Sequence, residues 1–230
     1  MNDRDIDEVL RKTAEVPHVV KPALLQRIAG SLEPSLRPVR PMLPSWALTL
    51  GLVLIGAAVA LAAALRAGFY GLEKMDLLER ALIFSALFFV AYAAATEFVS
   101  AMIPGSRRRV SSGNLMGFSV LILLGVFGLL FHDYHTEHFF SAGIVCLVTG
   151  VLHAIPVGLL GWLLLRRGFA VNAIAAGLVG GTLAGLAGIA LLELHCANFQ
   201  AFHILVWHTA VLPVSAALGA LFARTLRRRV

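Results

Sequence analysis

Six long apolar segments constrain the fold of this 230-residue chain more than any other feature. They lie at roughly 46–66, 81–103, 115–131, 141–165, 173–194 and 204–223, and each is close to the ~20 residues that an α-helix needs to cross a bilayer. Hydrophobic residues make up 59% of the chain and charged residues 14%. Because lipid tolerates only a backbone that is hydrogen-bonded internally, we predict an all-α, polytopic integral membrane protein. Residues 46–230 would form its six-transmembrane-helix bundle.

The basic residues are distributed unevenly over the loops between these segments. Sixteen lie in the N-terminal segment, in the loops after the second and fourth segments, and at the C-terminus, whereas three lie in the other loops. The three are Arg66, Lys74 and Arg80. Cytoplasmic loops carry the excess of Lys and Arg, so we expect both termini to be cytoplasmic. Orientation in the membrane thus accounts for the net charge of +6, and we predict no direct contact with nucleic acid.

Residues 1–45 have the pattern of a short cytoplasmic helical tail followed by a proline-rich spacer. Two amphipathic stretches carry apolar residues at helical spacing, namely Ile6, Val9 and Leu10 in the first and Leu24, Leu25 and Ile28 in the second. Helices this short are marginal on their own. We therefore expect a partner protein to cover the apolar residues, and the alternative is the surface of the bilayer.

Three glycines recur at every fourth position of the fifth segment, at Gly177, Gly181 and Gly185. Small residues at this spacing let two helix backbones approach closely. The pattern predicts a packing seam within the bundle, and a homodimer contact is the alternative.

The chain contains two cysteines, and both lie near the end of the bundle that the arginines predict to be outside. Cys146 is about one turn inside the fourth segment, and Cys196 follows the fifth. Disulfides persist in the periplasm and not in the cytoplasm, so this pair is placed for a reversible bond. The alternative is that both are small apolar packing residues.

Six histidines are candidate metal ligands, namely His132, His135, His138, His153, His195 and His203. Imidazoles suit borderline metals such as zinc, copper or nickel. No resident cofactor is expected, but a transient thiophilic metal ion held by both cysteines with His195 or His153 is one hypothesis. For the loop 132–138, the alternative is a solvated stretch that binds metals weakly.

The C-terminal third contains motifs that resemble those of a known protein family. Leu194-His195-Cys196, His203, Trp207-His208 and a Gly/Ala-rich last helix ending in arginines resemble the NrsF family, also called DUF1109. This family comprises six-helix inner-membrane anti-sigma factors. The resemblance implies that the tail holds an extracytoplasmic-function sigma factor and that the paired cysteines sense stress, for example heavy metals.

These observations predict a non-enzymatic signal transducer, a transmembrane anti-sigma factor of the bacterial inner (plasma) membrane. A small transporter or a metal-handling membrane protein is the alternative. The tail separates the two hypotheses, because a transporter has little use for two amphipathic cytoplasmic helices. The sequence has no evident serine–histidine–acid or paired-carboxylate constellation, which argues against an enzyme.

Overall fold

The computed structural model describes Glu8, Lys12 and residues 22–32, 43–103, 106, 110–167 and 172–227. The chain divides into two compact units, residues 1–42 and 43–230. In the first unit, helix α2 spans Pro22–Leu32 and begins with a proline, which is favoured in the first turn of a helix. Glu8 and Lys12 are also helical and form an exposed ion pair at 3.0 Å.

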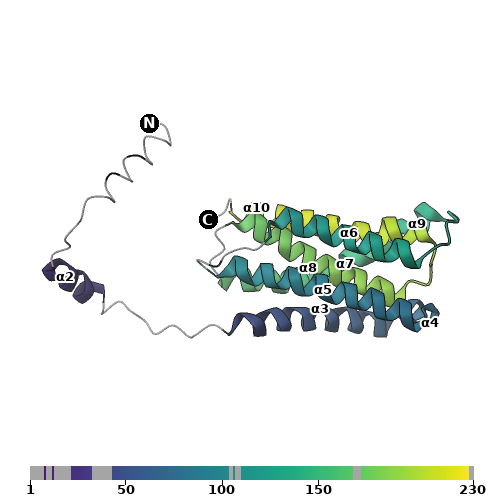
Figure 1. Ribbon diagram of the computed structural model, residues 1–230, viewed down its shortest axis with the longest axis horizontal. Coiled ribbons are helices and arrows are strands. Elements are labelled where there is room, and N and C mark those ends of the chain that lie inside the picture. The colour runs from purple at the N-terminus through teal and green to yellow at the C-terminus, as the bar shows by residue number, and fades with distance from the viewer. Residues whose placement is uncertain are drawn as a thin grey trace. The chain divides into compact units, whose positions relative to one another are not determined.

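The second unit is a bundle of helices (Figure 1), six of which are long and apolar enough to cross a membrane. They are α3 (Ser45–Ala67), α5 (Leu77–Met102), α6 (Ser112–Leu130), α7 (Phe139–Arg167), α8 (Ala173–His195) and a last helical stretch from Ala201 to Arg227. The short helix α4 (Tyr70–Lys74) follows α3. The six predicted spans and the all-helical fold are therefore confirmed, and the described residues form no β-sheet.

The second span begins earlier than its hydropathy predicts, at Leu77 rather than at about residue 81. The reason is a capping box, in which the Asp76 side chain accepts a hydrogen bond from the Glu79 backbone and the Glu79 carboxylate accepts one from the Asp76 backbone. These bonds satisfy two of the backbone N–H groups left free at a helix start. The first turn, Leu77–Arg80, thus belongs to the helix, although Glu79 and Arg80 separate its leucines from the apolar run.

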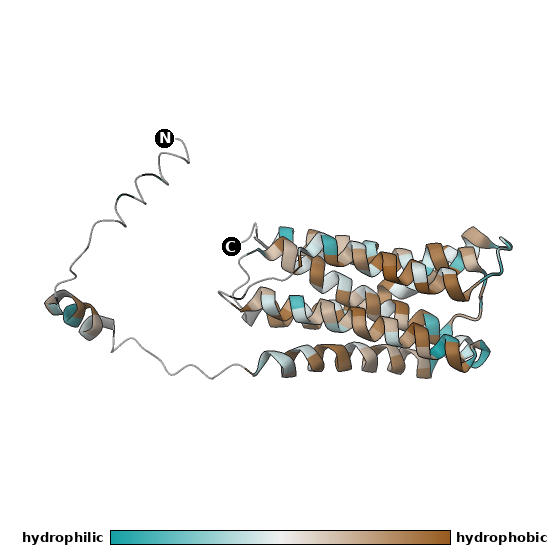
Figure 2. Cartoon of the chain, viewed as in Figure 1, coloured by the Kyte–Doolittle hydropathy of each residue, from teal (hydrophilic) through white to brown (hydrophobic). Residues whose placement is uncertain are grey.

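Helix α8 is the centre of the bundle and contacts α3, α5, α6, α7 and α10 (Thr209–Arg227). Of its apolar stretch, 72% is buried within the bundle, against 44% or less for each of the other spans. The other helices leave large apolar side chains such as Phe89, Leu129 and Leu163 exposed. Hydrophilic residues gather at the end of the bundle where α4 and α9 lie (Figure 2). This distribution suits a bundle surrounded by lipid.

The three glycines of the predicted seam lie against α10 of the same chain. A Cβ on Gly181 would lie 2.3 Å from the carbonyl oxygen of Ser215, and a Cβ on Gly177 would lie 2.5 Å from that of Gly219. A Cβ on Gly185 would lie 3.1 Å from the Cα of Leu212. The two helix backbones are therefore in direct contact, which any side chain at Gly177 or Gly181 would prevent.

The last span is not a uniform α-helix. It begins with the short α9 (Ala201–His203), continues as the π-helix η2 (Ile204–His208) and becomes α10 at Thr209. The predicted start at residue 204 is thus three residues late. Single π-turns inside α-helices frequently mark functional sites.

The orientation of the bundle in the membrane remains a prediction from the arginine distribution. Reporter fusions that follow His135 and Val230 should give opposite signals, with the reporter exported in the first and retained in the second. Signals of the same sign at both positions would contradict the six-span topology.

Candidate metal centre

The two cysteines meet at one end of the bundle. Cys146 lies in the second turn of α7, and Cys196 directly follows the last residue of α8. Their sulfur atoms are 3.6 Å apart, although the residues are separated by 50 positions. Both are free thiols and both are partly buried. The structure therefore brings the predicted pair into direct contact.

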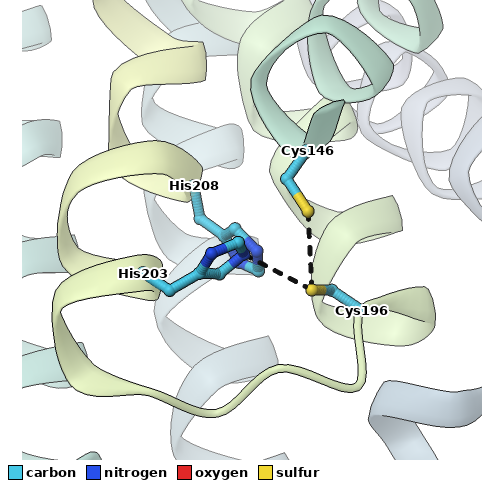
Figure 3. A group of neighbouring side chains, drawn as sticks. All are labelled: Cys146, Cys196, His203 and His208. Carbon is cyan, nitrogen blue, oxygen red and sulfur yellow. Dashed lines mark hydrogen bonds between the residues drawn. The ribbon is translucent and has the colours of Figure 1, made fainter. Parts of the chain in front are cut away.

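Two histidines of the last span complete a cluster with the cysteines (Figure 3). Nε2 of His203 lies 3.6 Å from the Cys196 sulfur. His203 and His208 are fully buried, and their rings are 5.3 Å apart at an angle of 76°. One ligand atom from each of the four residues lies within 4.8 Å of the others. The cluster thus offers two sulfur and two nitrogen atoms around a single point.

The π-helix η2 explains why these two histidines face the same way. In an α-helix, residues five positions apart point about 140° away from each other, since each residue turns by about 100°. A π-turn is closed by an i→i+5 hydrogen bond and returns residues five apart to the same side. His203 directly precedes this turn and His208 is its last residue, so its geometry directs both imidazoles to the cysteines.

The His208 side chain is held by a buried carboxylate. Its Nδ1 lies 2.7 Å from Oε1 of Glu193 in α8, and both side chains are at most 1% exposed. Since a carboxylate accepts, Nδ1 donates, which leaves Nε2 with its lone pair free in the neutral ring. Within the described chain, His208 Nε2 has no hydrogen-bond partner. Glu193 therefore orients the imidazole toward the cysteines.

The sequence did not predict the pair of His208 and Glu193, since neither residue is among the candidate site residues. One feature of the sequence does indicate such a pair. Glu193 is an acidic residue inside an apolar span, and such residues are rare and usually paired within the bundle.

The segment between α3 and α5 holds the end of α8 that carries Cys196. Lys74 donates a hydrogen bond at 2.9 Å to the carbonyl of Ala197, and Nδ1 of His195 donates one at 3.1 Å to the carbonyl of Gly68. A Cβ on Gly71 would lie 2.8 Å from the Cys196 carbonyl oxygen, so α4 also packs tightly here. These contacts restrict the position of the Cys196 backbone.

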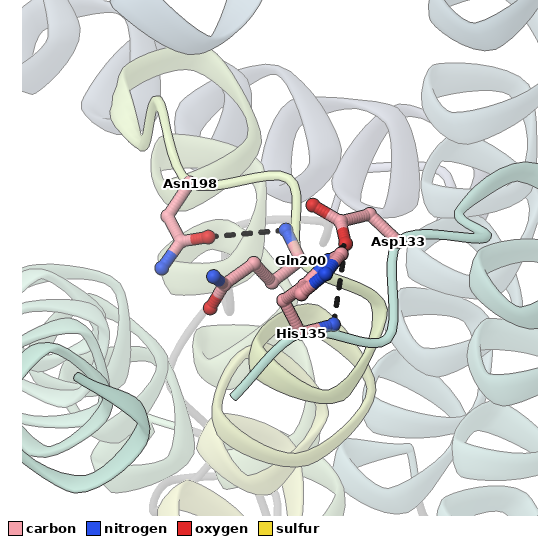
Figure 4. A network of polar contacts seen from close by, with 4 residues as sticks. All are labelled: Asp133, His135, Asn198 and Gln200. Atoms are coloured by element: carbon pink, nitrogen blue, oxygen red, sulfur yellow. Dashed lines mark hydrogen bonds and ion pairs between the residues drawn. The ribbon is translucent and has the colours of Figure 1, made fainter. Parts of the chain in front are cut away.

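A second set of contacts ties the loop after α6 to the start of α9 (Figure 4). Asp133 forms a β-bridge with Gln200, and its carbonyl oxygen accepts a hydrogen bond from the Ala201 backbone at 2.5 Å. The Gln200 backbone also donates to the Asn198 side chain at 3.0 Å. The segment between Cys196 and His203 is therefore fixed by a loop from another part of the chain.

Helix α7 approaches the π-helix at a glycine. Trp207 packs directly on Gly143, where a Cβ would lie 2.0 Å from the indole Nε1. The Trp207 ring also contacts Phe139 and Phe140, with centroids 5.4 Å and 6.1 Å away. Because Cys146 is one turn beyond Gly143, this contact places its thiol beside the histidines.

The contacts within the cluster change the ionisation of Cys196. Its contact with Cys146, and then those with His203 and His208, lower the pKa of the Cys196 thiol, whereas burial raises it. The net direction is downward. The thiolate is the form that binds metals and attacks disulfides, and these contacts favour the thiolate at Cys196.

The other candidate histidines lie outside this cluster. His132, His135 and His138 are exposed in the loop before α7. Asp133 contacts His135 in this loop, which raises the pKa of His135 and lowers that of Asp133. His153 donates from Nδ1 to the Thr149 carbonyl at 2.8 Å. His195 is hydrogen-bonded to the Gly68 carbonyl. Of the six candidate histidines, only His203 belongs to the cluster with the cysteines.

The tail residues of the predicted partner surface are described in part. Leu25 and Ile28 are 54% and 46% exposed on α2. Ile6, Val9, Leu10 and the side chain of Leu24 lie outside the described residues.

Comparison with known proteins adds one finding. The model of the NrsF family, described as negative regulator of sigma F, matches residues 32–228. The family description is that of a regulator and not of an enzyme. Neither a curated protein nor a solved structure matches the chain.

Proposed function

The chain belongs to the NrsF family of negative regulators of sigma F, and on this premise we propose that it is an anti-sigma factor that sequesters an extracytoplasmic-function sigma factor at the bacterial inner membrane. Both termini are cytoplasmic in this proposal. The tail binds the sigma factor, and the Cys146–Cys196 pair receives a redox or heavy-metal signal from the periplasm. The observation that carries the sensing role is the 3.6 Å contact between the two sulfur atoms.

The tail supports the binding role through its apolar residues. Leu25 and Ile28 are three positions apart on α2, which places them on one face of the helix, and both are exposed. An amphipathic helix with such a face binds in the groove of a partner protein. Folding on binding also accounts for a short helix that has little stability of its own.

The cysteines support the sensing role because a link between them changes the relation of two helices. Cys146 belongs to α7 and Cys196 to the end of α8, and both helices contact α3, which continues from the tail. A disulfide or a metal ion that joins the two sulfurs stabilises an arrangement of the bundle only if the sulfurs are closer in it than in the alternative arrangement. The arrangement that is stabilised then decides whether the tail releases or retains the sigma factor.

The experiment that tests the partner is co-purification of the full chain with each extracytoplasmic-function sigma factor of the same genome. The double variant Leu10→Asp, Leu25→Asp is expected to weaken binding by at least about 100-fold, since each buried apolar anchor contributes about 2 kcal/mol or more. Sigma-dependent transcription should rise to its released level in the same cells.

The matched control is Gln26→Asp, which adds the same charge to α2 away from Leu25 and Ile28. It should bind the sigma factor like the wild type. Unchanged binding by the double variant would show that the sigma factor uses another surface.

A further inference from the structure

We propose that Cys146, Cys196, His203 and His208 form a tetrahedral site with two sulfur and two nitrogen ligands for a thiophilic divalent metal ion, with Glu193 positioning His208. This inference rests on the proposed function, because it names the ligand class of the sensor. It replaces the earlier hypothesis that His195 or His153 assists the cysteines.

The distances between ligand atoms fit such a site. Zinc is bound at about 2.3 Å by thiolate sulfur and at about 2.0–2.1 Å by imidazole nitrogen. In a tetrahedron, these bond lengths separate two sulfurs by about 3.8 Å and a sulfur from a nitrogen by about 3.5 Å. The Cys146–Cys196 and Cys196–His203 contacts are both 3.6 Å. Since all four atoms lie within 4.8 Å of one another, small side-chain rotations close the shell.

The donor atoms decide which ions the site selects. Two thiolates and two imidazoles form the set that zinc and other soft or borderline ions prefer, whereas magnesium and calcium require oxygen ligands. The Glu193 carboxylate contacts His208 through Oε1 and contributes no atom to the four-ligand cluster. The site therefore discriminates against hard cations.

The Glu193–His208 contact has the arrangement of an outer-shell pair around a metal. Metal-ligating histidines almost always donate their second ring N–H to a carboxylate or carbonyl, which fixes the tautomer. His208 donates from Nδ1 to Glu193 and has a buried Nε2 without a hydrogen-bond partner in the described chain. A buried polar atom without a partner is costly, and a metal ion would satisfy this nitrogen.

Contacts outside the four ligands hold the segments that carry them. The π-turn directs both histidines inward, and the contacts at Lys74 and Asp133 hold the segments that carry Cys196 and His203. Binding one M²⁺ ion displaces one proton from each thiol, so that two protons are released and the two negative charges balance the ion. The ion joins α7, the end of α8 and the start of the last span.

The direct test is X-ray absorption on the purified full-length protein loaded with Zn²⁺. We expect one ion per chain with two sulfur neighbours at about 2.3 Å and two nitrogen neighbours at about 2.0–2.1 Å. This measurement needs no variant. A shell made of oxygen and nitrogen without sulfur would overturn the site.

Titration with Co²⁺ then identifies the ligands through its thiolate charge-transfer and tetrahedral d–d absorption. His203→Gln and His208→Gln should each lower the affinity by more than about 100-fold, and Glu193→Gln by about 10- to 100-fold with the same ligand count. The matched control His153→Gln removes a histidine of α7 outside the cluster and should bind like the wild type. Thermal unfolding and size exclusion verify that each variant is folded.

The outcomes separate this inference from the proposed function. Wild-type affinity in both His203→Gln and His208→Gln would overturn the histidine ligands. A wild-type protein that binds neither Zn²⁺ nor Co²⁺, but still binds its sigma factor and responds to oxidant, would overturn the metal site and leave the proposed function standing. Failure to bind any sigma factor would instead count against the proposed function.

Discussion

Gly181→Leu is expected to prevent the bundle from assembling, because the facing atoms belong to a backbone that cannot move alone. A Cβ at this position would lie 2.3 Å from the carbonyl oxygen of Ser215 and 2.8 Å from the Cα of Ala216. Relief would require α10 to separate from α8, the most buried helix of the bundle. Where neighbouring side chains can move aside, overpacking costs about 1–3 kcal/mol. We expect a larger loss of stability at Gly181, because the neighbouring atoms belong to the backbone.

The measurement is thermal unfolding in detergent together with the yield of monodisperse protein. Gly125→Leu in α6 is the matched control, since no neighbouring atom of the described residues lies within 4 Å of a Cβ at that glycine. It should unfold like the wild type. Gly181→Ala should fall between the two. An unchanged unfolding temperature for Gly181→Leu would mean that α8 and α10 are farther apart than in this structure.

Cys146→Ser and Cys196→Ser are each expected to lock the output of the sensor. Serine has nearly the same size as cysteine, so the fold should be retained, but its hydroxyl forms neither a disulfide nor a bond to a thiophilic metal. If Cys146 and Cys196 cannot be linked, the signal stabilises neither arrangement of the bundle over the other, and their populations do not change. The ratio of sigma-dependent transcription with and without oxidant or metal should therefore fall to about one in both variants.

The control for this experiment is Ala142→Ser, which introduces a serine into α7 one turn before Cys146. It should leave the response intact. Wild-type responses in both cysteine variants would make the cysteines packing residues. The loop from His132 to His138 would then be the better candidate for the sensor.

The local sequence was sufficient to predict the six helices. Their apolar runs are long enough to cross a membrane, and hydropathy depends only on residues that follow one another along the chain. The ends were predicted less well, as at Leu77, because a capping box extends a helix through polar residues that an apolar run omits. The arginine distribution predicts the orientation in the same local way, and the family resemblance is confirmed over residues 32–228.

The partners of individual side chains depended on tertiary structure. The depth of a residue in the membrane follows from its distance along the chain to the end of its span, and this distance suggested that Cys146 and Cys196 lie at one level. The rotation of each helix about its own axis does not follow from the sequence, because it is set by how neighbouring helices pack. This rotation brings Cys146 to Cys196.

The sequence by itself therefore determined the helices, their number and their small-residue faces, since these follow from composition and spacing over one or two turns. Only the tertiary structure decided the candidate metal centre. Its residues come from α7, the end of α8 and the last span, and the π-turn at Ile204–His208 departs from the period that a helical pattern assumes. The Glu193–His208 pair likewise joins two elements, α8 and the π-helix η2. Packing at glycines such as Gly143 and Gly181 sets the rotation and spacing of the helices, and thereby determines which side chains meet.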